Sequence, residues 1–133
     1  MKRTLTLIAL VVLLVASNNF AQAKEKLTDN QLQTLITGIK SDNPGLKRSS
    51  IFFAGYYKLT ETVDVLKDEM LNAENPDIQI LAALALYEIG DDNVITDLNM
   101  LAKNKDEDYK VRRMAQAIYE HWVNDKNFVS AAY

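Results

Sequence analysis

The feature that most constrains the fold is an internal repeat with a period of about 32 residues. The pair Asn43-Pro44 recurs one period later as Asn75-Pro76. Three segments then carry residues at successive spacings of 4, 3 and 4, which place them on one stripe of an α-helix. The stripes are Leu46, Ser50, Phe53 and Tyr57; Ile78, Ala82, Ala85 and Ile89; and Val111, Ala115, Ile118 and Trp122. Such a period predicts stacked helical units, and the small second residue of each stripe predicts a close helix crossing.

A second helix is predicted after each of the first two stripes. One carries Val63, Leu66 and Met70, and the other carries Ile95, Leu98 and Ala102, again one period later. Gly90 is expected to end the preceding helix with a positive φ, and the side chain of Asp91 or Asp92 to cap the next one. Lys58 stands where the first unit would have that glycine.

The helix predicted after Thr28-Asp29 aligns with a second helix, because Leu32, Leu35 and Ile39 lie nearly one period before Val63, Leu66 and Met70. We expect it to be a half-repeat that covers the apolar end of the stack. The predicted organisation is a signal peptide at 1–23 and a repeat domain at 24–126, with a tail at 127–133 that folds back through Phe128 or stays loose. Within the domain, the half-repeat covers 28–40 and the full units cover 44–73, 76–104 and 107–124.

The alanine-rich middle unit carries a family resemblance. Ala82-Ala83-Leu84-Ala85-Leu86, Ile89-Gly90-Asp91 and Val111-Arg112 resemble the HEAT-like repeats of the phycobilisome-lyase type, over about residues 43 to 123. The first unit departs from that pattern at Ser49–Phe53. The resemblance implies an all-α fold, a short right-handed α-solenoid of helix pairs, and a bond from Arg112 to the preceding loop or Asp77. Tetratricopeptide and ankyrin signatures are not met.

The N-terminus has the pattern of an export signal. Lys2 and Arg3 precede an apolar run from Leu5 to Ala16, and Ala21-x-Ala23 supplies the small residues of a cleavage site. The run is short for a bilayer-spanning helix, which needs about 20 apolar residues. We therefore expect a periplasmic or secreted protein of bacterial type without a membrane anchor, an uncleaved N-terminal anchor being the alternative.

Composition excludes several classes of function. The chain has no Cys and one His, His121, so no thiolate chemistry is possible and a histidine-based metal site has too few ligands. His121 is expected to be a solvated residue near a helix end. Residues 24–133 hold 13 basic and 18 acidic residues, a balance of −5, which argues against nucleic acid as a partner. We expect no catalytic residues, no cofactor and no metal.

The candidate binding residues come from helix registers. Phe53 and Tyr57 share the core stripe, and Phe52 is expected to pack. Tyr56 aligns with the polar Glu88 and His121 and should be exposed. Exposed tyrosines are favoured at binding hot spots. The other candidates are polar positions of the second helices, which should line a concave side: Asp64, Lys67, Asp68, Thr96, Asn99 and Lys103.

These features favour a monomeric, exported module that binds another protein and is not an enzyme. The resemblance leaves open a lyase or isomerase acting on a tetrapyrrole. A periplasmic protein that binds unfolded chains weakly is a third possibility.

Overall fold

The computed structural model describes residues 27–131, with side chains described as far as residue 126, and these residues form helices and no strands. The predicted signal peptide therefore lies outside the described residues. The elements are α2 (Asp29–Ile39), α3 (Pro44–Tyr56), a 3-10 turn η1 (Thr60–Thr62), α4 (Val63–Asn72), α5 (Pro76–Ile89), α6 (Val94–Lys103) and α7 (Tyr109–Ala131).

Polar residues before the helices set where they begin. Thr28 and Gln31 form a capping box at α2. The Asn43 side chain accepts hydrogen bonds from the N–H groups of Gly45 and Leu46, and Asn75 accepts one from Asp77. The proline after each asparagine lies in the first turn, where its missing N–H costs nothing.

Helix α6 begins differently from the prediction. Neither Asp91 nor Asp92 caps it through a side chain. Their backbone carbonyls accept from the N–H groups of Val94 and Ile95 at 3.1 and 3.3 Å. The Asp91 carboxylate instead accepts from the N–H of Asn93. Gly90 has the predicted positive φ, at 82°.

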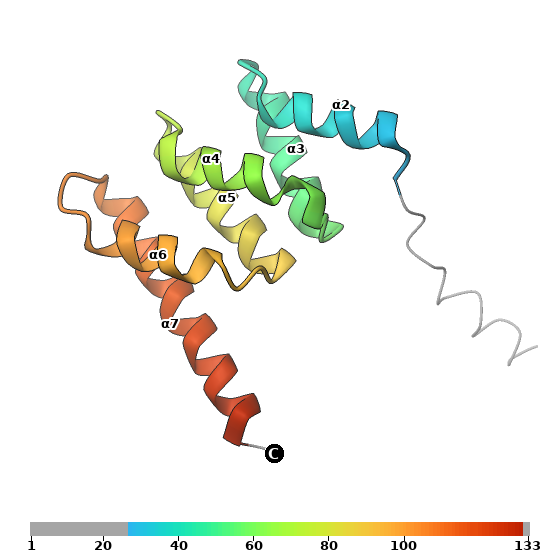
Figure 1. The fold of residues 1–133 in the computed structure, drawn as a ribbon. Helices are drawn as coiled ribbons and strands as arrows, with labels where there is room; N and C mark the ends of the chain where they lie inside the picture. Colours follow the sequence, from blue (N-terminus) through green and yellow to red (C-terminus); the bar gives the residue numbers. More distant parts are fainter. Residues whose placement is uncertain (1–26, 132–133) are drawn as a thin grey trace, which may run out of the picture.

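The helices form two layers (Figure 1). The second helices α2, α4 and α6 lie in one row and the first helices α3, α5 and α7 in the other. Helix α3 packs on α5 and α5 on α7, while α2, α4 and α6 each pack on the first helix that follows them. The predicted all-α stack of helix pairs is confirmed, and α2 packs on α3 where the half-repeat was expected.

The core confirms the predicted stripes of the second and third units but not that of the first. Ile78, Ala82 and Ala85 are buried, as are all four residues of the stripe that ends at Trp122. In the first unit Leu46, Phe53 and Tyr57 are 51%, 45% and 43% exposed. Of this stripe only Ser50 is buried, and helix α3 otherwise buries Ile51, Ala54 and Gly55, which lie off the stripe.

The cause of this error is the end of the stack. In the later units, stripe residues contact the preceding first helix: Ala85 lies against Gly55 of α3, and Trp122 packs on Tyr87 of α5. Helix α2 is a second helix, and no first helix precedes it among the described residues. The predicted close crossing is nevertheless present, because Gly38 of α2 approaches Ser50 so closely that a Cβ would collide with its hydroxyl.

Helix α7 continues to Ala131, into the segment expected to form a separate tail. His121 therefore lies well inside the helix and not near its end. It is exposed, and its Nε2 lies 3.5 Å from the carboxylate of Asp125. The side chain of Phe128 lies outside the described residues. None of the described helices is long and apolar enough to cross a bilayer.

Candidate interaction surfaces

The first candidate surface is the second-helix row, which we define as Asp64, Lys67 and Asp68 on α4 with Thr96, Asn99 and Lys103 on α6. The Lys67 ammonium lies 2.8 Å from an Asp97 carboxylate oxygen and so joins the two helices. This hydrogen bond, more than the surrounding carboxylates, raises the pKa of Lys67 above its ordinary value, although partial burial opposes it. The Lys67 side chain is thus already paired with a carboxylate of the same protein.

The other members of the row are less tightly held. Asp68 accepts a hydrogen bond from the Asn72 amide at 2.8 Å. Asp64 and Asp68 line a hollow of about 380 Å³ beside Ile36 and Lys40 of the half-repeat. On α6, Thr96 and Lys103 are exposed and Asn99 is half-buried. The six residues share one layer of the fold (Figure 1), and of them Asp64 and Asp68 line the same hollow.

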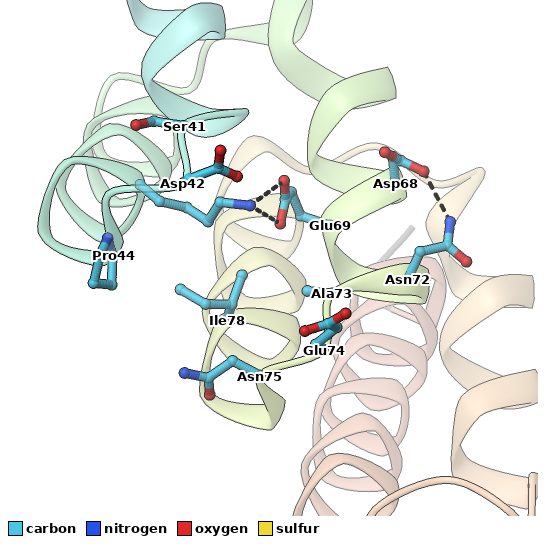
Figure 2. A pocket seen from close by; sticks show the side chains of 11 residues that line it. Ser41, Asp42, Pro44, Asp68, Glu69, Asn72, Ala73, Glu74, Asn75 and Ile78 are labelled. Atoms are coloured by element: carbon cyan, nitrogen blue, oxygen red, sulfur yellow. Dashed lines mark hydrogen bonds and ion pairs between the residues drawn. The ribbon is translucent and has the colours of Figure 1, made fainter.

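A polar cleft of about 450 Å³ lies between the α2–α3 and α4–α5 loops (Figure 2). At its centre the Lys47 ammonium donates to both carboxylate oxygens of Glu69, at 2.7 and 2.8 Å. Both side chains are largely buried, so the pair is a structural tie between α3 and α4. Asp42, Asp68 and Glu74 line the same cleft. No cluster of metal-binding side chains occurs among the described residues.

Lys47 belongs to a series of equivalent positions, followed by Gln79 and Arg112. The Gln79 amide donates to the backbone carbonyl of Met70 at 3.2 Å, so it too ties a first helix to a second one. Arg112 differs from the expectation. The Asp77 carboxylate instead lies 3.7 Å from the Arg48 guanidinium. The Arg112 guanidinium lies over the Tyr109 ring. Its buried Nε has no acceptor within the described part of the chain.

Four aromatic side chains form a continuous exposed cluster on α3 and its C-terminal end. We define the aromatic cluster as Phe52, Phe53, Tyr56 and Tyr57. Neighbouring ring centroids lie 5.1 to 6.1 Å apart, in stacked and edge-on arrangements. Tyr56 is 64% exposed, which confirms the prediction for this residue. Phe52 is 55% exposed, so the expectation that it packs is wrong.

The aromatic cluster continues into an apolar groove between α3 and α5, of about 550 Å³. This α3–α5 groove is lined by Phe52, Gly55, Tyr56, Leu81, Leu84, Ala85 and Glu88. A Cβ at Gly55 would lie only 2.8 Å from the Cα of Ala85, so the two helices nearly touch there. Glu88 is exposed and forms no ion pair with the other described residues. The groove is therefore apolar with one exposed carboxylate.

Of the seven residues that line this groove, the sequence predicted only Tyr56 as a binding residue. The others include Phe52, Leu81, Leu84 and Glu88. A signal was present, because α5 is apolar around most of its circumference and Leu81 and Leu84 lie off its core stripe. Leu84 is 38% exposed as a result. An apolar residue off the stripe could indicate either a second buried contact or an exposed surface, and the sequence does not distinguish them.

The remaining aromatic residues have different roles. Tyr87 packs edge-on against Trp122, with ring centroids 5.4 Å apart, and its hydroxyl donates to Asp125 at 3.3 Å. Burial, and next the Asp125 carboxylate, raises the pKa of Tyr87. Tyr109 is as exposed as Tyr56, at 64%, but lies at the start of α7 and away from the aromatic cluster.

Comparison with known proteins gives one match. A sequence model of a family described as HEAT repeats matches residues 32–118, which is more than half of the chain. The match runs from α2 into α7. Searches of curated proteins and of solved structures found no match.

Proposed function

The chain belongs to the HEAT repeat family, and from this premise we propose that it is an exported module that binds another protein through the aromatic cluster and the α3–α5 groove. Stacked helix pairs present extended surfaces and not enclosed pockets, which suits binding to macromolecules. The proposal includes a periplasmic or secreted location, a monomer, and action by binding and not by catalysis.

The observation that carries the proposal is the exposed aromatic cluster. An aromatic side chain has roughly 200 Å² of surface, so four rings that are 43–64% exposed leave about 400 Å² uncovered. Patches of this size on a monomer often mark interaction sites. Tyr, with its apolar ring and polar hydroxyl, is also enriched among residues that dominate binding energy.

The second-helix row is proposed as a secondary contact. Lys67 and Asp68 already bind Asp97 and Asn72, so a partner would have to replace those bonds. Asp64, Thr96 and Lys103 need no such replacement, and Thr96 and Lys103 are exposed. Asn99 lies between them and is half-buried.

Site-specific photo-cross-linking in cells tests the proposal. A photoreactive amino acid at Tyr56 should capture one discrete partner protein, identified by mass spectrometry. The same amino acid at Tyr109, which is equally exposed, is the matched control and should capture no such partner. Absence of capture from Tyr56, or equal capture from Tyr109, would overturn the proposed surface.

The proposed export is tested separately. The protein recovered from the periplasm or medium should begin at Lys24, as N-terminal sequencing would show. Replacing Ala21 and Ala23 by bulky residues should leave the longer precursor, because signal peptidase requires small residues there. A protein that keeps Met1 in the cytoplasm would contradict the location.

A further inference from the structure

We propose that the α3–α5 groove binds an amphipathic α-helix of another protein, with the apolar face of that helix on Phe52, Leu81 and Leu84 and a Lys or Arg of that helix beside Glu88. This inference rests on the proposed function and adds the chemical class of the partner segment.

The shape of the groove favours a helix. Its two walls are themselves helices, and the close approach of Gly55 to Ala85 forms its floor. Because backbone lies near backbone there, close packing fixes the spacing of the two helices that form its walls. A helix binds such a surface through apolar residues spaced three or four apart, and Leu81, Leu84 and Phe52 offer apolar surface for them.

The charges around the groove define its polarity. Glu88 lies near the C-terminal end of α5, where the unpaired carbonyls of the helix add a partial negative charge. The loop that follows contains Asp91 and Asp92, of which Asp92 already binds Lys126. A cation is therefore favoured at the Tyr56–Glu88 end, and the net charge of −5 over residues 24–133 also favours a basic partner.

The same facts disfavour a second copy of this chain as the occupant. Two aromatic clusters of about 400 Å² each would bury about 800 Å² in total, below the roughly 1,200 Å² of a stable interface. Pairing two copies would also bring two surfaces together that each carry an exposed Glu88 and an excess of acidic residues. A helix from a different, basic protein avoids this repulsion, and an interface of this size suits a weak, transient complex.

Peptide binding to the exported protein tests the proposal. The probe is a labelled synthetic amphipathic helix with leucines on one face and lysines on the other. Its controls are the same peptide with glutamates for lysines and a scrambled peptide of the same composition. Fluorescence anisotropy should show that the lysine peptide binds at least about tenfold more tightly than either control, since tenfold is the size of an ordinary hot-spot effect.

Variants of the protein locate the binding. Phe52→Ala and Leu84→Ala should each weaken binding about tenfold. Met100→Ala on α6, where Met100 is 57% exposed, is the matched control and should change nothing. Glu88→Lys should weaken the lysine peptide and strengthen the glutamate peptide. Because these residues are exposed in part or in full, circular dichroism of each variant should be unchanged.

Three results would overturn this inference: equal binding of the scrambled peptide, no effect of Phe52→Ala and Leu84→Ala, or a dimer in sedimentation that Phe52→Ala dissociates. If Tyr56 captures a partner in cells while no helical peptide binds, the proposed function stands and the helix proposal falls. Peptide binding in the groove with no capture from Tyr56 in cells would instead overturn the proposed function.

Discussion

At the scale of single residues, Lys58 adopts a left-handed backbone conformation that suits the glycine at the equivalent position of the next unit. Lys58 and Gly90 occupy equivalent positions, and both have positive φ, at 52° and 82°. The N–H groups of Lys58 and Leu59 donate to carbonyls at the end of α3, so the chain has to turn there. A left-handed conformation costs a residue with a Cβ roughly 1–2 kcal/mol. Lys58 is therefore a strained position that the fold imposes.

Replacing Lys58 by Gly should raise the free energy of unfolding by about 0.5–1 kcal/mol, because the relieved strain exceeds the added entropy of the unfolded chain. Urea unfolding measures it. The converse change, Gly90→Ala, should lower the free energy of unfolding by about 1 kcal/mol, because alanine is strained at this positive φ. A steric clash does not contribute, since a Cβ at Gly90 meets no atom within 4 Å. A Lys58→Gly protein less stable than the wild type would contradict this account.

At the scale of helices, one close crossing determines both packing and the α3–α5 groove. Gly55 lies against Ala85 where α3 crosses α5. In the alignment of units the small slot is Ser50, Ala82 and Ala115, and Ser50 indeed meets Gly38. The contact at Gly55 lies outside that slot. Small residues therefore mark two crossings in the first unit, one with α2 and one with α5.

Gly55→Ala should lower the free energy of unfolding by about 1–3 kcal/mol, because the new methyl group would force α3 and α5 apart. Gly45→Ala is the control in the same helix, since the nearest atom to its Cβ is the Asn43 side chain at 3.4 Å. That variant should be neutral or slightly more stable, as Ala is the better helix former. Equal effects of the two changes in thermal unfolding would show that the crossing does not limit stability.

The contact between α4 and α6 should give a pH-dependent term at the same scale. Because Asp97 raises the folded-state pKa of Lys67 above the unfolded value of about 10.4, the stabilisation is complete below that pH and is lost as pH rises through the folded pKa. The stability difference between wild type and Lys67→Met should therefore shrink as the pH rises above the ordinary lysine pKa of about 10.4 and through the raised pKa of Lys67.

Urea unfolding at several pH values measures that difference. Lys103→Met is the control, because Lys103 is exposed and forms no ion pair with other described residues. A difference for Lys67→Met that stays constant with pH would mean that its bond to Asp97 does not contribute in solution.

At the scale of the whole molecule, the internal first helices α3 and α5 each pack against neighbours on two sides. Helix α5 packs against α3, α4 and α7, and α6 packs mainly against α7. Losing one helix would expose the apolar stripe of the next, so a stack this short should unfold as one unit. The ends differ, because the aromatic cluster at the α3 end is left open to solvent among the described helices.

The fluorescence of Trp122 tests whether unfolding is cooperative, since Trp122 is the single tryptophan and is buried in α7. Its urea unfolding curve should coincide with the curve from far-UV circular dichroism, which follows all helices. An earlier transition by circular dichroism would show that the α2 end unfolds independently of α7.

The sequence alone predicts the period, the helix pairs, the starts of α3 and α5 and the end of α5. These depend on local chemistry: apolar spacing, asparagine caps before Pro44 and Pro76, and the positive φ of Gly90. The start of α6 and the end of α7 differ from the prediction. The sequence also identified Tyr56 as exposed. The repeat register makes Phe53 equivalent to the buried Ala85, and nothing local distinguishes them.

Only the tertiary structure decided which stripes are covered. Burial of a stripe depends on whether a neighbouring helix covers it. Helix α3 has α5 on one side and α2 on the other. Among the described residues, no first helix precedes α2. The α3–α5 groove likewise requires two helices to meet at Gly55 and Ala85, which belong to different units of the repeat. Periodicity therefore specifies which apolar residues of each helix could be buried. The packing of neighbouring helices determines which of these residues stay exposed and available to a partner.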